Sequence, residues 1–268
     1  MENLNKKFIQ AVKNGNFKET EELAKLGANI DSEYGEALYR SVFNNNLKMV
    51  EYLIKLGANI HIRNNAAIIR SAIDGNLEIF KCLKRAGANI LPLNQAIECG
   101  RLEIVKFIYE SGVVFNEDHL AIASEKGYLD IVKFIYNIGV RINGTALIKA
   151  SEHGHLEVVK FLLESGFKDT TDINLAFRKA ASGGHLEILK ILLKFGADVT
   201  TRNNTALINA ASFGHVDVVK FLLDHNADVH AQNDTAIVLA NSFNHSEVVK
   251  VLLNAGANIY AQTSSIPV

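Results

Sequence analysis

The stretch Gly184-His-Leu-Glu-Ile-Leu-Lys-Ile-Leu-Leu-Lys-Phe-Gly196-Ala-Asp-Val199 decides the fold, because near-copies of it run along the whole chain. It predicts a helix that begins after one glycine and ends before the next, since glycine suits the left-handed conformation in which many helices end. We call the first glycine of each copy its anchor. The anchors are Gly15, Asn45, Gly75, Gly100, Gly127, Gly154, Gly184, Gly214 and Asn244. Their spacing of 25 to 30 residues is typical of a solenoid built from repeated helical units.

Each unit contains two predicted helices. The second has apolar residues at anchor +2, +4, +5, +7, +8 and usually +9, which together form one broad helical face. An acid at anchor +3 and a lysine at anchor +6 recur in seven units, as expected of a solvated helix face. The first helix is shorter, with a bulky apolar residue at anchor −7 and Ala or Ser at anchor −4, where neighbouring backbones approach closely. The pattern predicts an all-α fold of nine helix-turn-helix units.

The composition excludes several classes of protein. Apolar residues make up 48% and charged residues 21% of the chain, which excludes disorder. The net charge of −1 produces no global field that would favour nucleic acid or an anionic membrane. No apolar run is long enough to span a bilayer, and the first residues lack the apolar stretch of a signal peptide. Cys82 and Cys99 fit a reducing compartment, so we expect an intracellular, cytoplasmic protein.

The repeats resemble a known family. Gly-Ala-Asp-Val (196–199) followed by Ala-Ala-Ser-Phe-Gly-His-Val-Asp-Val-Val-Lys-Phe-Leu-Leu (210–223) is similar to the ankyrin repeat, and all nine units fit. The usual Thr-Pro-Leu-His opening is absent, and most units are about three residues shorter than the usual 33. The deficit lies between Val199 and Thr205, so we expect short turns in place of most β-hairpins. These short units also resemble the ankyrin arrays of giant viruses of amoebae (mimivirus-like), with arrays of protists as the competing source.

We expect one domain over residues 1–268. The approximate repeats are 5–30, 36–60, 66–90, 92–115, 118–142, 145–169, 175–199, 205–229 and 235–259, with a tail at 260–268. Glu19 and Thr20 occupy slots that are apolar elsewhere, which predicts a polar N-terminal cap. The tail either folds over the last repeat or leaves that face open to another molecule. We favour folding back and a monomer, with end-to-end association through the last repeat as the alternative.

The sequence contains little that points to catalysis. His155, His185, His215 and His245 all stand at anchor +1. Packed helices lie roughly 8–10 Å apart, so these imidazoles cannot share a metal whose ligands lie about 2 Å away. The ankyrin resemblance implies instead that they tie adjacent loops together. No phosphate-binding loop, metalloprotease helix or nucleophile elbow is present. We therefore expect no enzymatic activity, cofactor, metal or small-molecule substrate.

The resemblance implies that a partner protein binds at the loop tips and at the ends of the first helices, which line one concave face. One hypothesis is an acidic stripe of Glu98, Glu125 and Glu152, lying in a recess between shortened loops and accepting a basic segment. The alternative is three solvated glutamates, which we favour slightly because such residues are common on surfaces.

A second hypothesis concerns apolar residues at the ends of the first helices. Phe213 and Phe243, joined by Phe43 and Ile73, would be interface residues of the kind that dominate binding energy. In the alternative, each ring covers the turn of its neighbour. His153, Arg63 and Arg202 complete the candidate binding residues.

The sequence thus predicts a non-enzymatic protein-binding scaffold, and the viral resemblance implies a host protein as partner in the host cytoplasm. The alternative function is a substrate-recruiting adaptor of a ubiquitin ligase. Only nine residues follow Ile259, too few for an F-box-like segment, so recruitment would need a separate contact surface.

Overall fold

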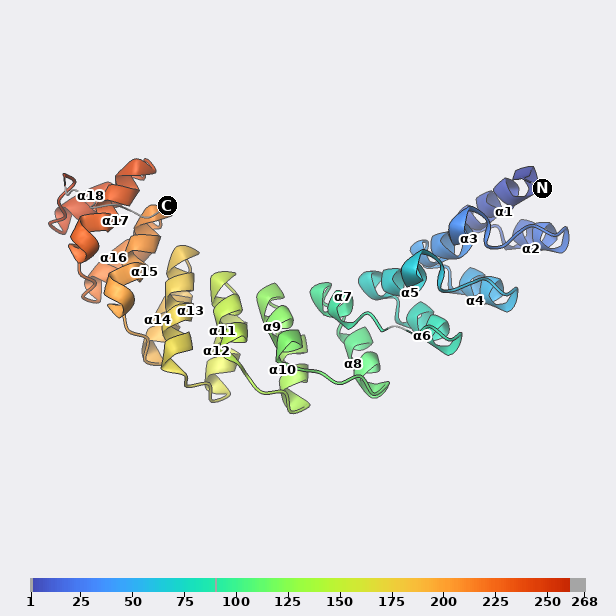
Figure 1. Ribbon diagram of the computed structural model, residues 1–268, viewed down its shortest axis with the longest axis horizontal. Coiled ribbons are helices and arrows are strands. Elements are labelled where there is room, and N and C mark those ends of the chain that lie inside the picture. Colours follow the sequence, from blue (N-terminus) through green and yellow to red (C-terminus); the bar gives the residue numbers. More distant parts are fainter. Residues whose placement is uncertain (1, 90, 261–268) are drawn as a thin grey trace. The chain divides into compact units, whose positions relative to one another are not determined.

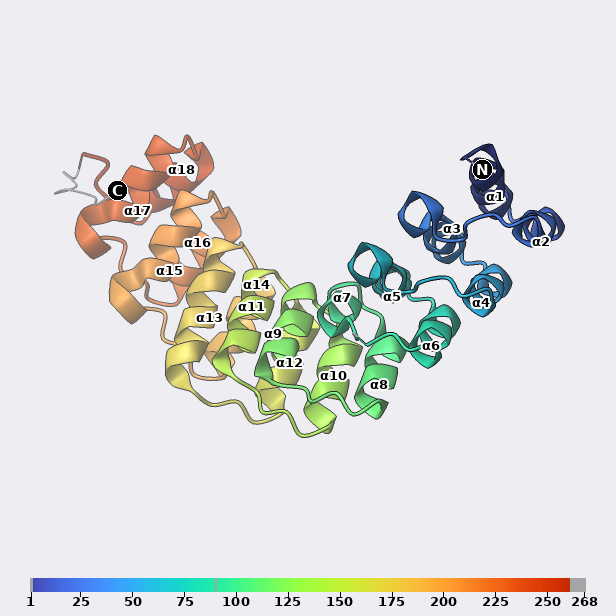
Figure 2. The same cartoon turned by 45° about the vertical axis from the view of Figure 1, so that its right-hand side comes forward.

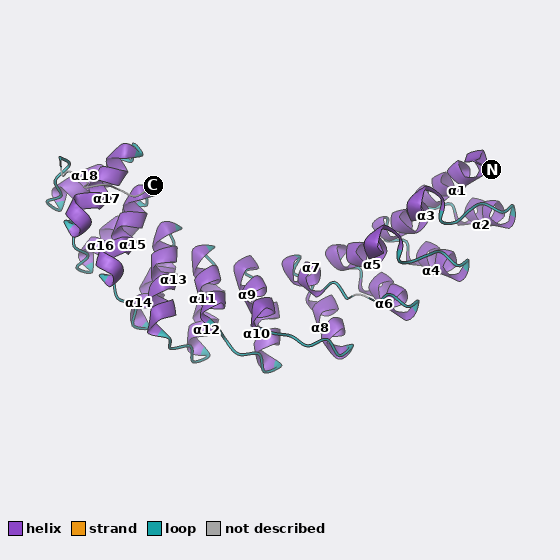
Figure 3. Cartoon of the chain, viewed as in Figure 1, coloured by secondary structure: helices purple, strands orange, loops and turns teal. Residues whose placement is uncertain are grey.

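The structure is a computed structural model that describes residues 2–89 and 91–260. In this part of the chain there are eighteen helices and no strand, which confirms the predicted all-α fold (Figures 1 and 3). The helices are α1 Glu2–Lys13, α2 Phe17–Lys25, α3 Ser32–Phe43, α4 Leu47–Lys55, α5 Ile62–Asp74, α6 Leu77–Arg85, α7 Leu93–Glu98, α8 Leu102–Glu110, α9 Glu117–Lys126, α10 Leu129–Asn137, α11 Gly144–Glu152, α12 Leu156–Glu164, α13 Thr170–Ser182, α14 Leu186–Lys194, α15 Thr201–Ser212, α16 Val216–Asp224, α17 Ala231–Ser242 and α18 Ser246–Asn254.

The chain divides into two compact units, Met1–Val114 with α1–α8 and Phe115–Val268 with α9–α18. Within each unit the odd-numbered first helices form one layer and the even-numbered second helices another (Figures 1 and 2). Within each unit the first helices pack on their own second helices and on the neighbouring first helices, as α11 does with α12 and α13. Such stacking of neighbours is how a repeat protein builds its core. The assignment of residues 1–268 to one domain, with the repeat limits above, stays a prediction.

The first helices stack through small residues. Ala150 and Ala180, at anchor −4 of adjacent repeats, are both 0% exposed, and Leu147 and Phe177 at anchor −7 are equally buried. A larger side chain at anchor −4 would push the backbones of α11 and α13 apart. The sequence-based interpretation of this position is therefore confirmed.

The first turns of four of the first helices, α3, α5, α15 and α17, differ from what the sequence predicted. Each consists of three successive residues in the left-handed region: 33–35, 63–65, 202–204 and 232–234. In one of them Arg202, Asn203 and Asn204 have φ of 49°, 54° and 59°, and the Asn204 N–H donates to the Thr200 carbonyl at 3.0 Å. A short turn was expected, but not one turn of left-handed helix. The other loops of the second unit, such as residues 140–143, contain no regular structure.

A polar clamp connects the two ends of a repeat. The Asn204 side-chain oxygen accepts a hydrogen bond from the Asp228 N–H at 2.9 Å, and Asn174 accepts one from the Asp198 N–H at 2.7 Å. The Asp198 carboxylate in turn accepts from the Thr200 N–H at 2.8 Å. These bonds hold the starts of α13 and α15 against the loops that end their repeats.

The predicted ends of the array are only partly described. Glu19 is exposed and Thr20 is 0% exposed, with its hydroxyl donating to the Asn16 carbonyl at 2.8 Å. Thr20 is therefore a buried polar residue whose hydroxyl is satisfied inside the helix, and of the two residues of the predicted polar cap only Glu19 is exposed to solvent. Tyr260 is exposed, whereas residues 261–268, on which the alternatives for the tail depend, lie outside the described residues.

Candidate protein-binding surface

The histidines at anchor +1 tie adjacent repeats together. Each Nε2 lies within hydrogen-bonding distance of the backbone carbonyl at anchor −2 of the preceding repeat. Because a carbonyl can only accept, Nε2 is the protonated nitrogen. The pairs are His155 with Glu125 at 2.7 Å, His185 with Glu152 at 3.1 Å, His215 with Ser182 at 2.8 Å and His245 with Ser212 at 2.9 Å. The role implied by the family resemblance is confirmed.

Each of these histidines also lies against the anchor glycine of the preceding repeat. Gly127 has φ of 75°, and a Cβ placed on it would lie 2.4 Å from Nδ1 of His155. The same holds for the pairs Gly154–His185, Gly184–His215 and Gly214–His245. The anchor glycine is therefore needed twice, for its backbone conformation and for the space that the imidazole fills.

The aromatic candidates in the second unit are open to solvent. Phe213 is 60% and Phe243 57% exposed, at the C-terminal ends of α15 and α17. Each ring packs against the histidine two residues later, with centroid distances of 6.3 Å to His215 and 6.4 Å to His245. More than half of each ring remains available for contact with another molecule.

In the first unit Phe43 is 46% exposed and lies between two guanidinium groups, with Arg40 at 5.8 Å and Arg70 at 4.7 Å from the ring centroid. Ile73 is half-buried, and its carbonyl accepts a hydrogen bond from Arg101 Nε at 2.8 Å. Phe43 and Ile73 thus lie at an edge where charged side chains flank apolar surface.

The glutamates of the proposed acidic stripe are paired with lysines in the second unit. Lys149 Nζ lies 3.2 Å from Glu125 Oε2, and Lys179 Nζ lies 2.8 Å from Glu152 Oε1. The hydrogen bond from Lys179 lowers the pKa of Glu152 against the opposing effect of burial. Glu98 belongs to the first unit and is exposed. Glu125 and Glu152 are therefore not free carboxylates, and a basic ligand would compete with Lys149 and Lys179.

Arg63 holds the repeats of the first unit together. Its Nε donates to the Tyr34 carbonyl at 2.9 Å, and one terminal nitrogen lies 2.7 Å from Glu36 Oε2. Burial raises the pKa of Glu36, but hydrogen bonds from Arg40 and Arg63 outweigh it and hold that pKa below its ordinary value. Arg63 is exposed, but its donors are engaged within the stack, and a partner would have to compete for them.

Arg202 and His153 are more accessible. Arg202 is exposed in its left-handed turn. Burial of Arg178 lowers the pKa of that residue below its ordinary value, and the charge of Arg202 lowers it further. His153 is also exposed and stacks on His155, with centroids 6.3 Å apart. Sequence reasoning missed Arg40, Arg70, Lys149 and Lys179, which all stand at anchor −5. A charged residue between the buried positions −7 and −4 is the signal that could have found them.

This arrangement defines an α-helical repeat protein whose exposed aromatic and charged side chains follow the first helices and their turns. A family model described as ankyrin repeats (3 copies) matches residues 93–177, 119–203 and 177–263, and one described as ankyrin repeat matches residues 37–65. The chain belongs to the ankyrin repeat family. Ankyrin repeats indicate a protein–protein interaction scaffold, and proteins built from them are generally non-enzymatic.

No curated protein matches the chain. Among the helices of residues 2–89 and 91–260, none is long and apolar enough to cross a membrane. The same residues include no group of three or more His, Cys, Asp or Glu side chains arranged to hold a metal ion.

Proposed function

We propose that the chain binds a partner protein through the surface of its first helices and the turns that precede them, with Phe213 and Phe243 as the central contacts in the second unit. The exposure of these two rings on adjacent repeats carries the proposal. Interfaces typically depend on a few large aromatic side chains surrounded by polar residues. Here Ser212 and Ser242, each directly before one of the two rings, supply polar groups beside them.

The acidic stripe is a weaker candidate within the same proposal. A basic segment bound to Glu125 and Glu152 would have to displace Lys149 and Lys179, and exposed ion pairs of this kind are worth little. Ile73, Phe43, Glu98 and His153 remain peripheral candidates. Arg63 is left out because its donors serve the repeat stack.

The test compares the full chain with the double variant Phe213→Ala/Phe243→Ala as bait for partner capture, followed by affinity measurement with the captured protein. Phe195→Ala is the matched control, because Phe195 is a 40% exposed phenylalanine at the end of the second helix α14. We expect the double variant to lose about 2 kcal/mol or more of binding energy, roughly 30-fold in Kd, with an unchanged circular dichroism spectrum. Equal binding by the double variant and the wild type would refute the proposal.

The short repeats and asparagine-rich turns support a finer proposal, that the chain is a viral protein acting on a host protein in the host cytoplasm. Capture from a lysate of an amoebal host tests it, and a partner that is absent from such hosts would contradict it. Recovery of cullin-type ligase components would favour the alternative function, an adaptor that recruits substrates to a ubiquitin ligase.

A further inference from the structure

The charge pattern on the second helices reverses between the second and third repeats. In α6 and α8 anchor +3 is acidic and anchor +6 is lysine, as Glu78 and Lys81 show, and the later repeats keep this order. In α2 and α4 the order is inverted. The inverted pairs are Lys18 with Glu21 and Lys48 with Glu51.

The inversion does not serve the folding of these helices. A lysine in the first turn faces the positive end of the helix dipole and costs a few tenths of a kcal/mol, whereas an acid there is favourable. In α6 and α8, Glu78–Lys81 and Glu103–Lys106 form ion pairs with Nζ–Oε1 distances of 3.1 and 2.7 Å. Lys18 and Lys48 are exposed and have no carboxylate partner among the described residues. They are therefore free to pair with groups on another molecule.

We propose that the second-helix face of the first unit, formed by α2, α4, α6 and α8, is self-complementary and binds a second copy of this chain. The two-fold axis lies in the contact plane, parallel to the helices and between α4 and α6. Rotation about such an axis keeps the helix direction but reverses the order of the repeats. Anchor +3 therefore meets anchor +3, the second repeat meets the third, and the first meets the fourth.

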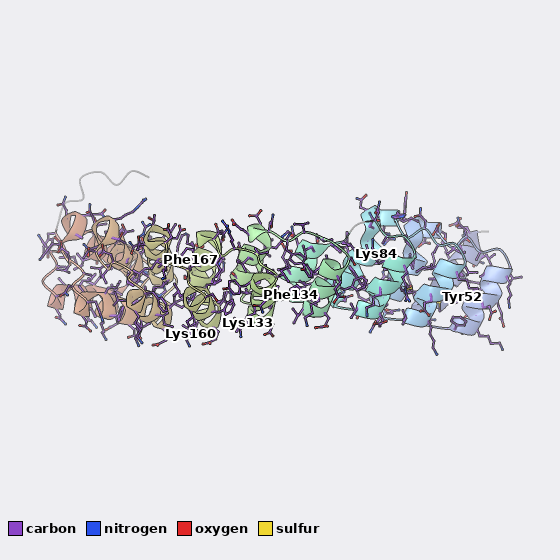
Figure 4. The ribbon with its side chains drawn as sticks, turned by 90° about the horizontal axis from the view of Figure 1, so that it is seen from below. Tyr52, Lys84, Lys133, Phe134, Lys160 and Phe167 are labelled. Atoms are coloured by element: carbon purple, nitrogen blue, oxygen red, sulfur yellow. The ribbon has the colours of Figure 1, made fainter. Side chains whose placement is uncertain are left out.

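Under this symmetry every reversed charge faces its opposite. Lys48 and Glu51 face Glu78 and Lys81 of the second copy. Lys18 and Glu21 face Glu103 and Lys106 of the second copy. Because a two-fold contact is isologous, each pair occurs twice. The four helices lie in one row in both Figure 1 and Figure 2, and Figure 4 views the chain from this side, with Tyr52 labelled on α4.

An aromatic pair on the same face adds apolar surface. Phe17 is 41% exposed and packs on Tyr52 with ring centroids 4.8 Å apart. Phe17 also lines a hollow with Gly15, Asn46 and Lys48, and the second copy covers this hollow in the dimer.

One pair opposes the contact. At anchor +10, Lys55 of α4 faces Arg85 of the second copy, whereas Lys25 of α2, which pairs with Glu21 of its own helix at 2.9 Å, faces Glu110 of the second copy. Exposed ion pairs are individually weak and are screened by salt. The dimer is therefore weak and dissociates as the ionic strength rises. This proposal differs from the monomer that we expected from the sequence.

The test is sedimentation equilibrium of the full chain at low and high salt, with paired charge reversals. Lys18→Glu/Lys48→Glu and Glu78→Lys/Glu103→Lys should each raise the dimer Kd about tenfold or more. An equimolar mixture of the two variants should dimerise again, because every contact at anchor +3 and anchor +6 then joins opposite charges. The matched control is Glu157→Lys/Glu187→Lys, at the same positions of second-unit repeats, which should leave the dimer Kd unchanged.

A single variant tests the same face without removing any favourable pair. Lys55→Glu turns the repulsion with Arg85 into attraction and should lower the dimer Kd. A wild type that stays monomeric at low salt would overturn the proposal. A dimer whose Kd is the same in all of these variants would also overturn the proposal, and would indicate that another surface, such as the last repeat, forms the contact.

Discussion

Each anchor glycine of the second unit paired with a histidine is constrained by its positive φ and by the imidazole packed against it. Two variants can separate these constraints. Gly127→Ala meets His155 at 2.4 Å and has φ of 75°, whereas Gly139→Ala has φ of 93° and nothing within 4 Å. Both variants place an alanine in the left-handed conformation, which lowers the free energy of unfolding by about 1–2 kcal/mol. Gly127→Ala should in addition lose the imidazole bond, another 0.5–1.5 kcal/mol or so. Urea denaturation should show this difference, and Gly127→Ala in a His155→Ala background should cost no more than Gly139→Ala. Equal losses in the single variants would contradict the interpretation.

Glu36 makes the stability of the first unit depend on pH. Its pKa is held below the ordinary value by Arg40 and Arg63 in the folded chain, so its contribution is complete above the unfolded pKa. The contribution disappears as the pH falls from the ordinary carboxyl pKa through the lowered one. Glu36→Gln should therefore unfold at lower urea than the wild type at neutral pH, and the two should converge in acid. Glu164→Gln, at an exposed position, is the control and should stay within about 0.5 kcal/mol of the wild type throughout.

At the scale of the elements, the left-handed turn explains the asparagines at the start of α15. Asn203 has φ of 54°, and its carbonyl accepts a hydrogen bond from Gln232 at 3.0 Å. Asparagine tolerates this conformation better than most residues, and β-branched residues tolerate it worst. Asn203→Val should lower stability by about 1–2 kcal/mol, whereas Asn203→Gly should be neutral or stabilising. Thermal unfolding of the two variants shows whether each gains or loses stability. An equal loss of stability in both would exclude backbone conformation as the cause.

The helices were predictable because their signal is local and repeated nine times over. The buried alanine at anchor −4 and the apolar stripe of α12 both follow from periodicity alone. The left-handed turn was not predictable, because it depends on the bond between Asn204 and Thr200 and on donors from the next repeat. For the same reason Glu125 looked free in the sequence, although Lys149 of the following repeat pairs with it. Contacts between repeats are therefore harder to predict from the sequence than the helices within one repeat.

At the scale of the whole molecule, the loss of stability caused by a core substitution should decrease with distance along the stack. Phe8 is 0% exposed in the first repeat, and Phe8→Ala should cost about 3–5 kcal/mol locally. In a repeat array such a loss spreads chiefly to neighbours. Hydrogen exchange should show loss of protection in α1–α4 and little change in residues 115–260. Uniform loss over both units would mean that the chain unfolds as one cooperative block.

The pairing of each histidine with the glycine before it also limits how such a chain can lengthen. A duplicate of residues 185–214 inserted after Gly214 would find a fitting neighbour on both sides, because the new imidazole meets Gly184 and the new glycine meets His245. The same duplicate placed after Gly75 would press its ring against the side chain of Asn45, which stands at the anchor of the preceding repeat. Growth by tandem duplication is thus favoured in the C-terminal half, where the nearly identical thirty-residue units are found, and disfavoured near the N-terminus.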